Sequence, residues 1–209
     1  MGPFLPASGF KLPLRPMLDS PLLFCCPIPL VPDLQKWLPA DRLTAPLASD
    51  LHDWLYEDKG SLTRRLTALA NGAFSVTPLF EGWQAMREDE CTALGVAAGS
   101  HGWVREVFLS GHEQPWVFAR SVAAQQALEQ SELDLPHLGS RSLGELLFSD
   151  PAFQRSQLEA RHYPIEWLPE AVRRPGLWAR RSCFSRGDLR VLVAEVFLPE
   201  LWQAARIIT

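Results

Sequence analysis

The chain has 209 residues, of which 47% are hydrophobic and 21% are charged, and its formal net charge is −4. These values are typical of one globular domain with a sizeable core. The mild acidity argues against a nucleic-acid-binding protein, because phosphate binding usually shows as a basic surplus. The sequence contains no uninterrupted run of about 18 apolar residues, which is the length that a membrane-spanning helix needs. We therefore expect neither a nucleic-acid partner nor stable membrane insertion.

Prolines concentrate near the start of the chain, where nine of the 18 lie in the first 40 residues. That density is incompatible with regular helix and predicts an extended, flexible arm over residues 1–30. A single globular domain is then expected over residues 31–209. The prolines also oppose a signal-type helix, and four cysteines are too few for a disulfide-held secreted fold. We predict a cytoplasmic protein with reduced thiols.

Two helical patterns follow the proline-rich arm. Apolar residues at helical spacing over 47–55 end near a break at 59–60. Ser61 can cap a second helix, which Asn71 and Gly72 can close. The two patterns predict a helical hairpin.

Strand patterns occupy the middle and the end of the chain. The segments concerned are residues 73–80, 103–109, 116–123 and the two halves of 180–198. Pro78 indicates an edge strand or a bulge, and the polar loop 110–115 predicts an antiparallel hairpin. The Arg-Gly-Asp tripeptide at 186–188 is interpreted as the turn of a second hairpin rather than as an adhesion motif.

Further helical patterns lie between and after these strands. They cover residues 123–130, 142–148, 152–160 and 200–207. Helices outside a mostly antiparallel sheet are typical of the α+β class.

Three charged residues lie on strand faces that are otherwise apolar. Successive side chains of a strand point to opposite faces, and this alternation places Arg105, Arg120 and Glu195 among apolar neighbours. A buried charge needs a partner, because leaving it unpaired is very costly. The alternatives are an internal salt bridge, such as Arg120 with Glu195, or a concealed polar pocket. Two cations against one anion favour an anionic ligand.

Motifs for metals and nucleotides are absent from the sequence. The five histidines are scattered, with no HExxH and no CxxC. No GxGxxG, P-loop or GxSxG occurs either. We therefore expect no metal and no cofactor.

Several stretches carry a resemblance to a known family. They lie at residues 54–55, 60–66 (GSLTRRL), 103–107 (WVREV), 115–122 (PWVFARSV), 143–148 (LGELLF), 176–182 (GLWARRS) and 194–199 (AEVFLP). In this order, over about 45–200, the chain resembles the chorismate pyruvate-lyase family of ubiquinone biosynthesis. The resemblance implies a single domain, with a six-stranded antiparallel sheet and peripheral helices that form flaps over an internal ligand site.

The resemblance also implies a function and a set of site residues. The function is that of a monomeric, cofactor-independent carbon–oxygen lyase, which eliminates pyruvate from chorismate to give 4-hydroxybenzoate, the first committed step of the pathway. By position, Arg105 and Glu195 are the catalytic, substrate-binding pair. Leu62, a methionine in some relatives, and Leu143 supply backbone or apolar contacts. We assign Arg120 to the second carboxylate of the substrate or to the support of Glu195.

The chemistry that the resemblance implies is driven by aromatisation of the ring. Arg105 holds the ring carboxylate and Glu195 accepts the ring hydroxyl, while hydrogen passes directly to the enolpyruvyl methylene. Alternatively, Glu195 acts as a general base. A lid over an aromatic product implies product inhibition. The competing interpretation is a non-catalytic metabolite-sensing domain of the same fold, as found in transcription regulators, although residues 1–45 are too short and proline-rich for a DNA-binding module.

Overall fold

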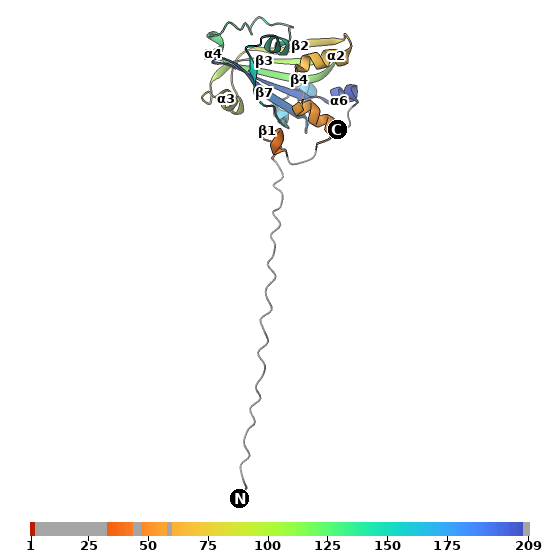
Figure 1. Ribbon diagram of the computed structural model, residues 1–209, viewed down its shortest axis with the longest axis vertical. Helices are drawn as coiled ribbons and strands as arrows, with labels where there is room; N and C mark the ends of the chain where they lie inside the picture. The colour runs from red at the N-terminus through yellow and green to blue at the C-terminus, as the bar shows by residue number, and fades with distance from the viewer. Residues whose placement is uncertain (3–32, 44–46, 58–59, 207–209) are drawn as a thin grey trace. The chain divides into compact units, whose positions relative to one another are not determined.

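The computed structural model describes residues 1–2, 33–43, 47–57 and 60–206 (Figure 1). The chain divides into two units, Met1–Leu30 and Val31–Thr209. The proline-rich arm predicted over residues 1–30 therefore lies almost entirely outside the described residues. All elements below belong to the second unit.

The described part of the chain forms one antiparallel sheet with helices packed around it. Its strands are β1 (Leu38–Pro39), β2 (Phe74–Ala85), β3 (His101–Gly111), β4 (Gln114–Ala124), β5 (Gln154–Arg155), β6 (Glu159–His162), β7 (Trp178–Arg186) and β8 (Leu189–Phe197). The strand order is β1-β6-β7-β8-β4-β3-β2, and β5 also pairs with β7. The predicted α+β class and antiparallel sheet are confirmed. The sheet has eight described strands rather than six, because β1 and β5 add two residues each.

The helices are short. They are α1 (Ser49–His52), α2 (Leu62–Ala70), α3 (Glu88–Leu94), α4 (Gln125–Glu129), α5 (Leu143–Ser149) and α6 (Pro199–Ala205). A π-helix, η2 (Asp53–Glu57), continues α1, and three 3₁₀ turns are η1 (Ala40–Arg42), η3 (Ile165–Trp167) and η4 (Glu170–Val172).

Capping and turn residues explain several of these boundaries. The Ser61 hydroxyl accepts a hydrogen bond from the Arg64 amide at the start of α2, and Asn71 ends the helix in the left-handed region at φ 46°. His112 and Glu113 join β3 to β4 with φ values of 51° and 62°. Such a two-residue turn matches the twist of the strands. Both predicted helical segments and the first strand hairpin are confirmed.

Two other sequence features also have the predicted structure. Gly187, at φ 58°, lies in the turn between β7 and β8, so the tripeptide at 186–188 is a hairpin turn. The pairing of β2 with β3 shifts its register between Pro78 and Phe80, which is the bulge that the proline indicated.

The helix predicted over 152–160 is wrong. This segment contains strands β5 and β6, which both pair antiparallel with β7. Its glutamine, leucine, glutamate and alanine residues favour helix, but pairing along an available strand outweighs that weak local preference. Helix α3 was not predicted, although its first turn holds three acidic residues and Gly95 ends it at φ 73°.

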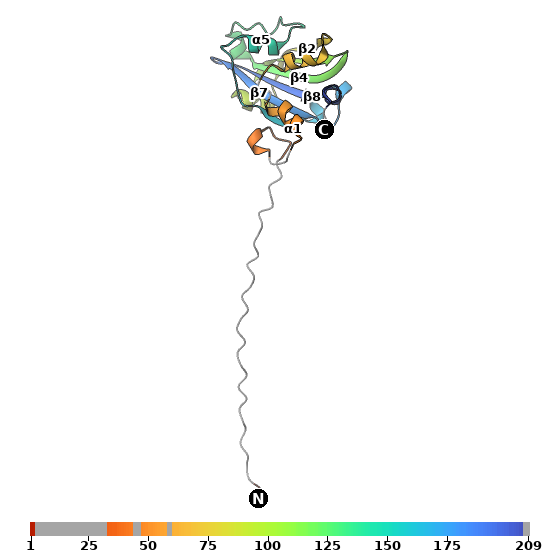
Figure 2. The ribbon, with the colours of Figure 1, turned by 45° about the vertical axis from the view of Figure 1, so that its right-hand side comes forward.

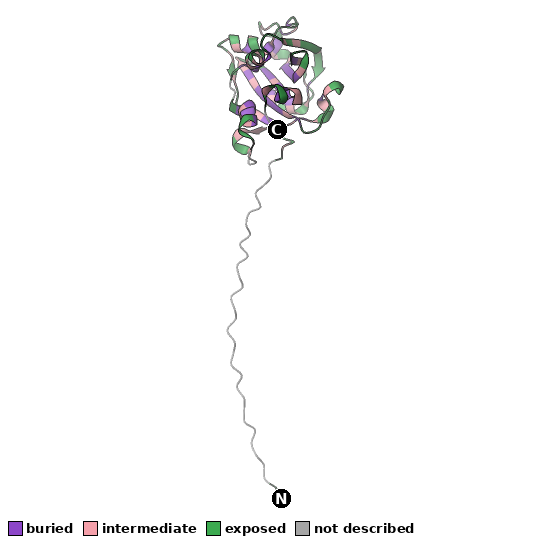
Figure 3. Cartoon of the chain, turned by 90° about the vertical axis from the view of Figure 1, so that its right-hand side faces the viewer, coloured by how far each residue is buried: buried purple, intermediate pink, exposed green. Residues whose placement is uncertain are grey.

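The sheet is covered on both faces. Helices α2, α5 and α6 and the segment α1–η2 pack on one face, in clusters that contain Leu66, Leu147 and Phe197. Helix α3 and the segment with η3 and η4 cover the other face, around Phe118 and Val122. Figures 2 and 3 show the helices about the sheet and the buried residues along its strands. Central strands buried on both faces can hold internal charges away from water.

Candidate active site

Arg105 and Glu195 lie on the same covered face of the sheet. Arg105 of β3 pairs with Ser121 of β4, and Glu195 of β8 pairs with Ala119 of β4. Directly paired residues share a face, and Ala119 and Ser121 are two positions apart on one strand. The structure therefore brings Arg105 and Glu195 together, separated by β4. From strand spacing and rise, their Cα atoms are about 12 Å apart.

Arg105 is almost completely buried, at 3% exposure, and has two kinds of partner. Its Nη1 forms an ion pair with the Glu81 carboxylate from the neighbouring strand β2. Its Nη2 donates to the Arg141 carbonyl at 3.0 Å, just before α5. These contacts use two of the five N–H groups of a guanidinium, so Arg105 is held in place with donors left for a ligand.

Glu195 is fixed by an arginine that the sequence interpretation missed. Arg180 of β7 is fully buried, and its Nε donates to Glu195 Oε2 at 2.6 Å. Arg180 Nη1 donates to the Trp54 carbonyl of η2 at 2.7 Å. The side chain of Glu195 keeps 13% exposure. One carboxylate oxygen of Glu195 is thus held by Arg180. Arg180 is bonded in turn to η2, which packs over this face of the sheet.

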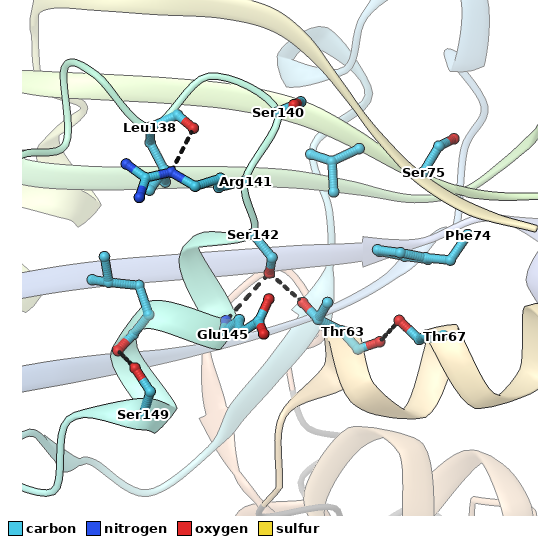
Figure 4. A pocket seen from close by; sticks show the side chains of 12 residues that line it. Thr63, Thr67, Phe74, Ser75, Leu138, Ser140, Arg141, Ser142, Glu145 and Ser149 are labelled. Carbon is cyan, nitrogen blue, oxygen red and sulfur yellow. Dashed lines mark hydrogen bonds between the residues drawn. The ribbon is translucent and has the colours of Figure 1, made fainter. Parts of the chain in front are cut away.

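Leu62 and Leu143 are the first residues of α2 and α5, and both are buried. The amides of a first helical turn have no acceptor within their helix, so each of these positions combines an apolar side chain with an available N–H region. The two helix starts lie together, because Thr63 Oγ1 and Ser142 Oγ are 2.6 Å apart (Figure 4). Four of the five predicted site residues therefore belong to one region.

A surface pocket of about 730 Å³ lies beside this region (Figure 4). Thr63 and Thr67 of α2, Phe74 of β2 and Glu145 of α5 are among its lining residues. Arg141 also lines it, and the carbonyl of this residue accepts the hydrogen bond from Arg105. None of the four converging site residues lines this pocket, so the buried charges mark the internal face rather than the surface pocket as the candidate active site.

Arg120 does not belong to this region, and the prediction that it supports Glu195 is wrong. Arg120 pairs with Glu106, the residue that follows Arg105 on β3, so it points to the opposite face of the sheet. There its Nε donates to Glu90 of α3 at 2.6 Å and its Nη1 to Glu106 at 2.8 Å. Alternation along one strand does not show which of its faces matches a given face of the next strand. The internal salt bridge between Arg120 and Glu195 is excluded for the same reason.

No group of three or more His, Cys, Asp or Glu side chains in the described part of the chain is arranged to hold a metal ion. No described helix has the length and apolar character required to span a membrane.

A family model for chorismate lyase matches residues 31–207. The chain belongs to the chorismate lyase family. It is 63% identical over 170 residues to a probable chorismate pyruvate-lyase 2 of Pseudomonas entomophila, which covers 81% of this chain and 91% of the relative. It is 62% identical over 177 residues to a probable chorismate pyruvate-lyase of Pseudomonas aeruginosa strain UCBPP-PA14, with 85% and 98% coverage.

Solved structures show more distant likenesses to this chorismate lyase family member. The effector domain of PhnF from Mycobacterium smegmatis matches with a TM-score of 0.44 and 13% identity, over 68% of this chain and 90% of that one. The effector-binding domain of the Bacillus subtilis trehalose repressor matches with a TM-score of 0.45 and 11% identity, over 60% and 91%. Both scores are below one half, so neither likeness bears on function.

Proposed function

We propose that the chain acts as a chorismate pyruvate-lyase at the internal face beneath α2 and α5, releasing pyruvate and 4-hydroxybenzoate, the precursor of ubiquinone. The observation that carries the site assignment is the placement of the buried Arg105 and the largely buried Glu195 on one covered face of the sheet, with β4 between their strands. Chorismate has a ring carboxylate at one end and a ring hydroxyl at the other. A cation and an anchored carboxylate on one face, with a single strand between them, can bind these two ends.

Arg105 binds the ring carboxylate in this proposal. Glu81 and the Arg141 carbonyl hold the guanidinium in place, and its remaining N–H groups can bond to the oxygens of a carboxylate. Leu62 and Leu143 supply apolar walls for the ring, and their helix starts add positive potential near the anion.

Glu195 accepts the hydrogen bond of the ring hydroxyl. The bond from Arg180 Nε to Oε2 fixes the orientation of the carboxylate, so its other oxygen can meet the substrate without reorganisation. Binding both ends of the ring selects one conformer of chorismate, and such positioning alone supplies much of the rate enhancement in a unimolecular reaction.

The elimination breaks two bonds of the substrate. The ether bond from the ring carbon to the enolpyruvyl oxygen breaks, and its oxygen becomes the carbonyl oxygen of pyruvate. Hydrogen leaves the hydroxyl-bearing carbon on the same side of the ring and forms the methyl group of pyruvate at the methylene carbon. The ring becomes aromatic, and no oxidant or other reactant is needed. Fixed charges in a dry site stabilise the charge that separates as the bonds change.

We propose that the enzyme is monomeric, as the resemblance to the family implies. The four cysteines are too few for a disulfide-held secreted fold, which supports a cytoplasmic location. Burial beneath α2 and α5 supports slow release of the aromatic product, and hence product inhibition.

The direct test mixes the purified protein with chorismate in metal-free buffer and measures 4-hydroxybenzoate and pyruvate. Equal amounts of both products are expected. Arg105→Ala should lower kcat/KM by about a hundredfold or more and weaken 4-hydroxybenzoate binding, because a charge-assisted pair is lost. Arg105→Lys should restore only part of it, because the two-point contact is absent. Unchanged activity in both Arg105→Ala and Glu195→Ala would refute the site assignment.

A further inference from the structure

The register of the sheet determines which side chains lie between Arg105 and Glu195. On β4, the strand that separates them, Ala119 pairs with Glu195. Two positions later, Ser121 pairs with Arg105. Each of these small residues is directly opposite one charged residue and diagonal to the other, and diagonal neighbours on a sheet are about 7–8 Å apart. A planar ligand that spans the two charges therefore lies over these two small side chains.

Ser121 adds one further polar side chain to this part of the face. Val107 of β3 pairs with Ala119, and Val193 of β8 pairs with Ser121. These two valines complete a patch of six positions, two on each of β3, β4 and β8, whose side chains point to one face. Apart from Arg105, the Ser121 hydroxyl is the only side-chain group of this patch that can donate a hydrogen bond.

The Ser121 hydroxyl is buried without using its hydrogen-bonding capacity. The residue is 7% exposed, and its side chain makes no hydrogen bond to any described residue. Most buried hydroxyls have a partner, because burying one without a hydrogen bond is unfavourable. The buried Ser182 on the same face follows this rule, since its hydroxyl accepts from Arg155 Nε at 2.8 Å. The Ser121 hydroxyl is therefore placed to donate to a bound ligand.

Ser121 also lies between two apolar clusters of this face. On β4, Ala119 belongs to the cluster that includes Leu62 of α2, and Ala123 belongs to the cluster that includes Leu143 of α5. Ser121 is midway between these alanines and belongs to neither cluster. The starts of α2 and α5, which carry the two leucines, meet above the sheet. A ring held between both leucines therefore lies over the boundary at Ser121.

We propose that Ser121 donates a hydrogen bond to the ether oxygen of chorismate. The assignment rests on the proposed function. With the ring carboxylate on Arg105 and the ring hydroxyl on Glu195, the ether lies on the carbon next to the hydroxyl, between the two ends that are bound. A conformer whose ether bond points towards the sheet places that oxygen above β4, where Ser121 supplies the donor.

This hydrogen bond strengthens as the ether bond breaks. The electron pair of that bond forms the carbonyl of pyruvate, the pair of the enol double bond takes up the transferred hydrogen, and the former C–H pair completes the aromatic ring. The hydrogen of the Ser121 hydroxyl stays on its own oxygen. An enol ether oxygen is a weak acceptor, whereas the oxygen of the breaking bond gains negative charge. The donor therefore stabilises the transition state more than the bound substrate.

The test separates stabilisation of the transition state from binding of the ring. Ser121→Ala should lower the single-turnover rate constant at saturating chorismate about 10- to 100-fold, which corresponds to the loss of one hydrogen bond. The half-saturating concentration of chorismate should stay nearly unchanged. The Kd for 4-hydroxybenzoate, which lacks the ether oxygen, should also stay unchanged in a calorimetric titration. Ser121→Thr keeps a hydroxyl and should restore most of the rate.

A matched control is Ser110→Ala, which removes a buried serine of β3 at 6% exposure, opposite Pro115 at the hairpin end of the strand. All three constants should stay unchanged in this control. An unaltered rate in Ser121→Ala, or a loss of 4-hydroxybenzoate binding parallel to the loss of rate, would overturn the proposal. Ser121→Cys has a similar shape and a weaker donor, should show the same selective loss, and serves if Ser121→Ala does not fold. An unaltered protein that releases no pyruvate from chorismate would instead refute the proposed function.

Discussion

The surroundings of Glu195 bear on whether this residue orients the substrate or acts as a general base. One of its oxygens is tied to Arg180, which is tied in turn to the Trp54 carbonyl. Such a fixed carboxylate is well suited to orient a hydroxyl. It is less suited to move towards a proton during the reaction. The arrangement therefore favours direct hydrogen transfer within the substrate over general base catalysis by Glu195.

Glu195→Gln tests this preference. A glutamine keeps the shape of the side chain; its one carbonyl oxygen can accept from Arg180 and its amide can donate to the ring hydroxyl. Direct transfer therefore predicts that kcat falls by less than about tenfold, whereas loss of a general base costs about 10²- to 10⁴-fold. Single-turnover kinetics with chorismate measure the effect. Glu159→Gln, which removes a carboxylate paired with Arg181 on the other face of the sheet at 2.8 Å, controls for the loss of an ion pair. A drop beyond a hundredfold only at Glu195 would favour the base.

Residue alternation along strands predicted Arg105 and Glu195 but not the whole site. Arg180 was missed because Arg181 follows it, so the strand offers one arginine to each face and the pattern does not choose between them. Glu81 was missed because the bulge between Pro78 and Phe80 interrupts the alternation of β2. The misplacement of Arg120 has a different cause, since the register between neighbouring strands is a property of the folded sheet.

At the scale of elements, α3 is fastened to the sheet through buried charges. Glu90 of α3 accepts two hydrogen bonds from Arg120, at 2.6 and 3.1 Å, and one from the Arg87 amide at 2.9 Å. Burial opposes ionisation of Glu90. The bonds and charges of Arg120 and Arg87 outweigh it and hold the pKa of Glu90 below its ordinary value of 4.5.

This cluster predicts an acid-sensitive contribution to stability. Because the pKa of Glu90 is lower in the folded than in the unfolded chain, its stabilisation is complete above pH 4.5 and is lost as the pH falls through the folded value. Glu90→Gln should lower the free energy of unfolding by about 3 kcal/mol at neutral pH and flatten the acid limb of a urea-unfolding series. Its KM for chorismate should not change. An acid limb as steep as that of the unaltered protein would contradict this assignment.

Local sequence signals predicted the hairpins and α2 because those elements are defined by neighbouring residues. Alternating apolar positions, a serine cap and a polar turn all act within a few residues. Strands β5 and β6 depend instead on the exposed edge of β7, which a propensity argument does not contain. The signals for α3 were present in its acidic first turn and Gly95, but its length of seven residues carries little periodicity.

At the scale of the whole molecule, the unit Val31–Thr209 coincides with the family match over 31–207. The Leu34 carbonyl accepts a hydrogen bond from the His162 amide at 2.8 Å, and Leu38 pairs with Ala160. The first described residues of this unit are therefore integrated into the sheet, and a shortened chain should keep them.

Removal of residues 1–30 should leave both Tm and kcat/KM for chorismate unchanged. All proposed site residues and all described elements lie after this segment. Thermal unfolding and the product assay on the shortened and full-length chains measure the outcome. A chain shortened to begin at Thr44, which lacks β1 and the Leu34 contact, should unfold at a lower temperature. A loss of turnover on removing only the first 30 residues would show that the arm takes part in the reaction.

The opposite orientation of Arg105 and Glu106 has a practical consequence for engineering. In the centre of β3, β4 and β8, the odd-numbered positions face the proposed substrate site and the even-numbered positions face α3 and its ion cluster. Residues that determine substrate binding and residues that determine stability thus alternate along the same strands. A mutant library that aims at a new substrate can be restricted to alternate codons, and a second library on the remaining codons can restore whatever stability the first one loses.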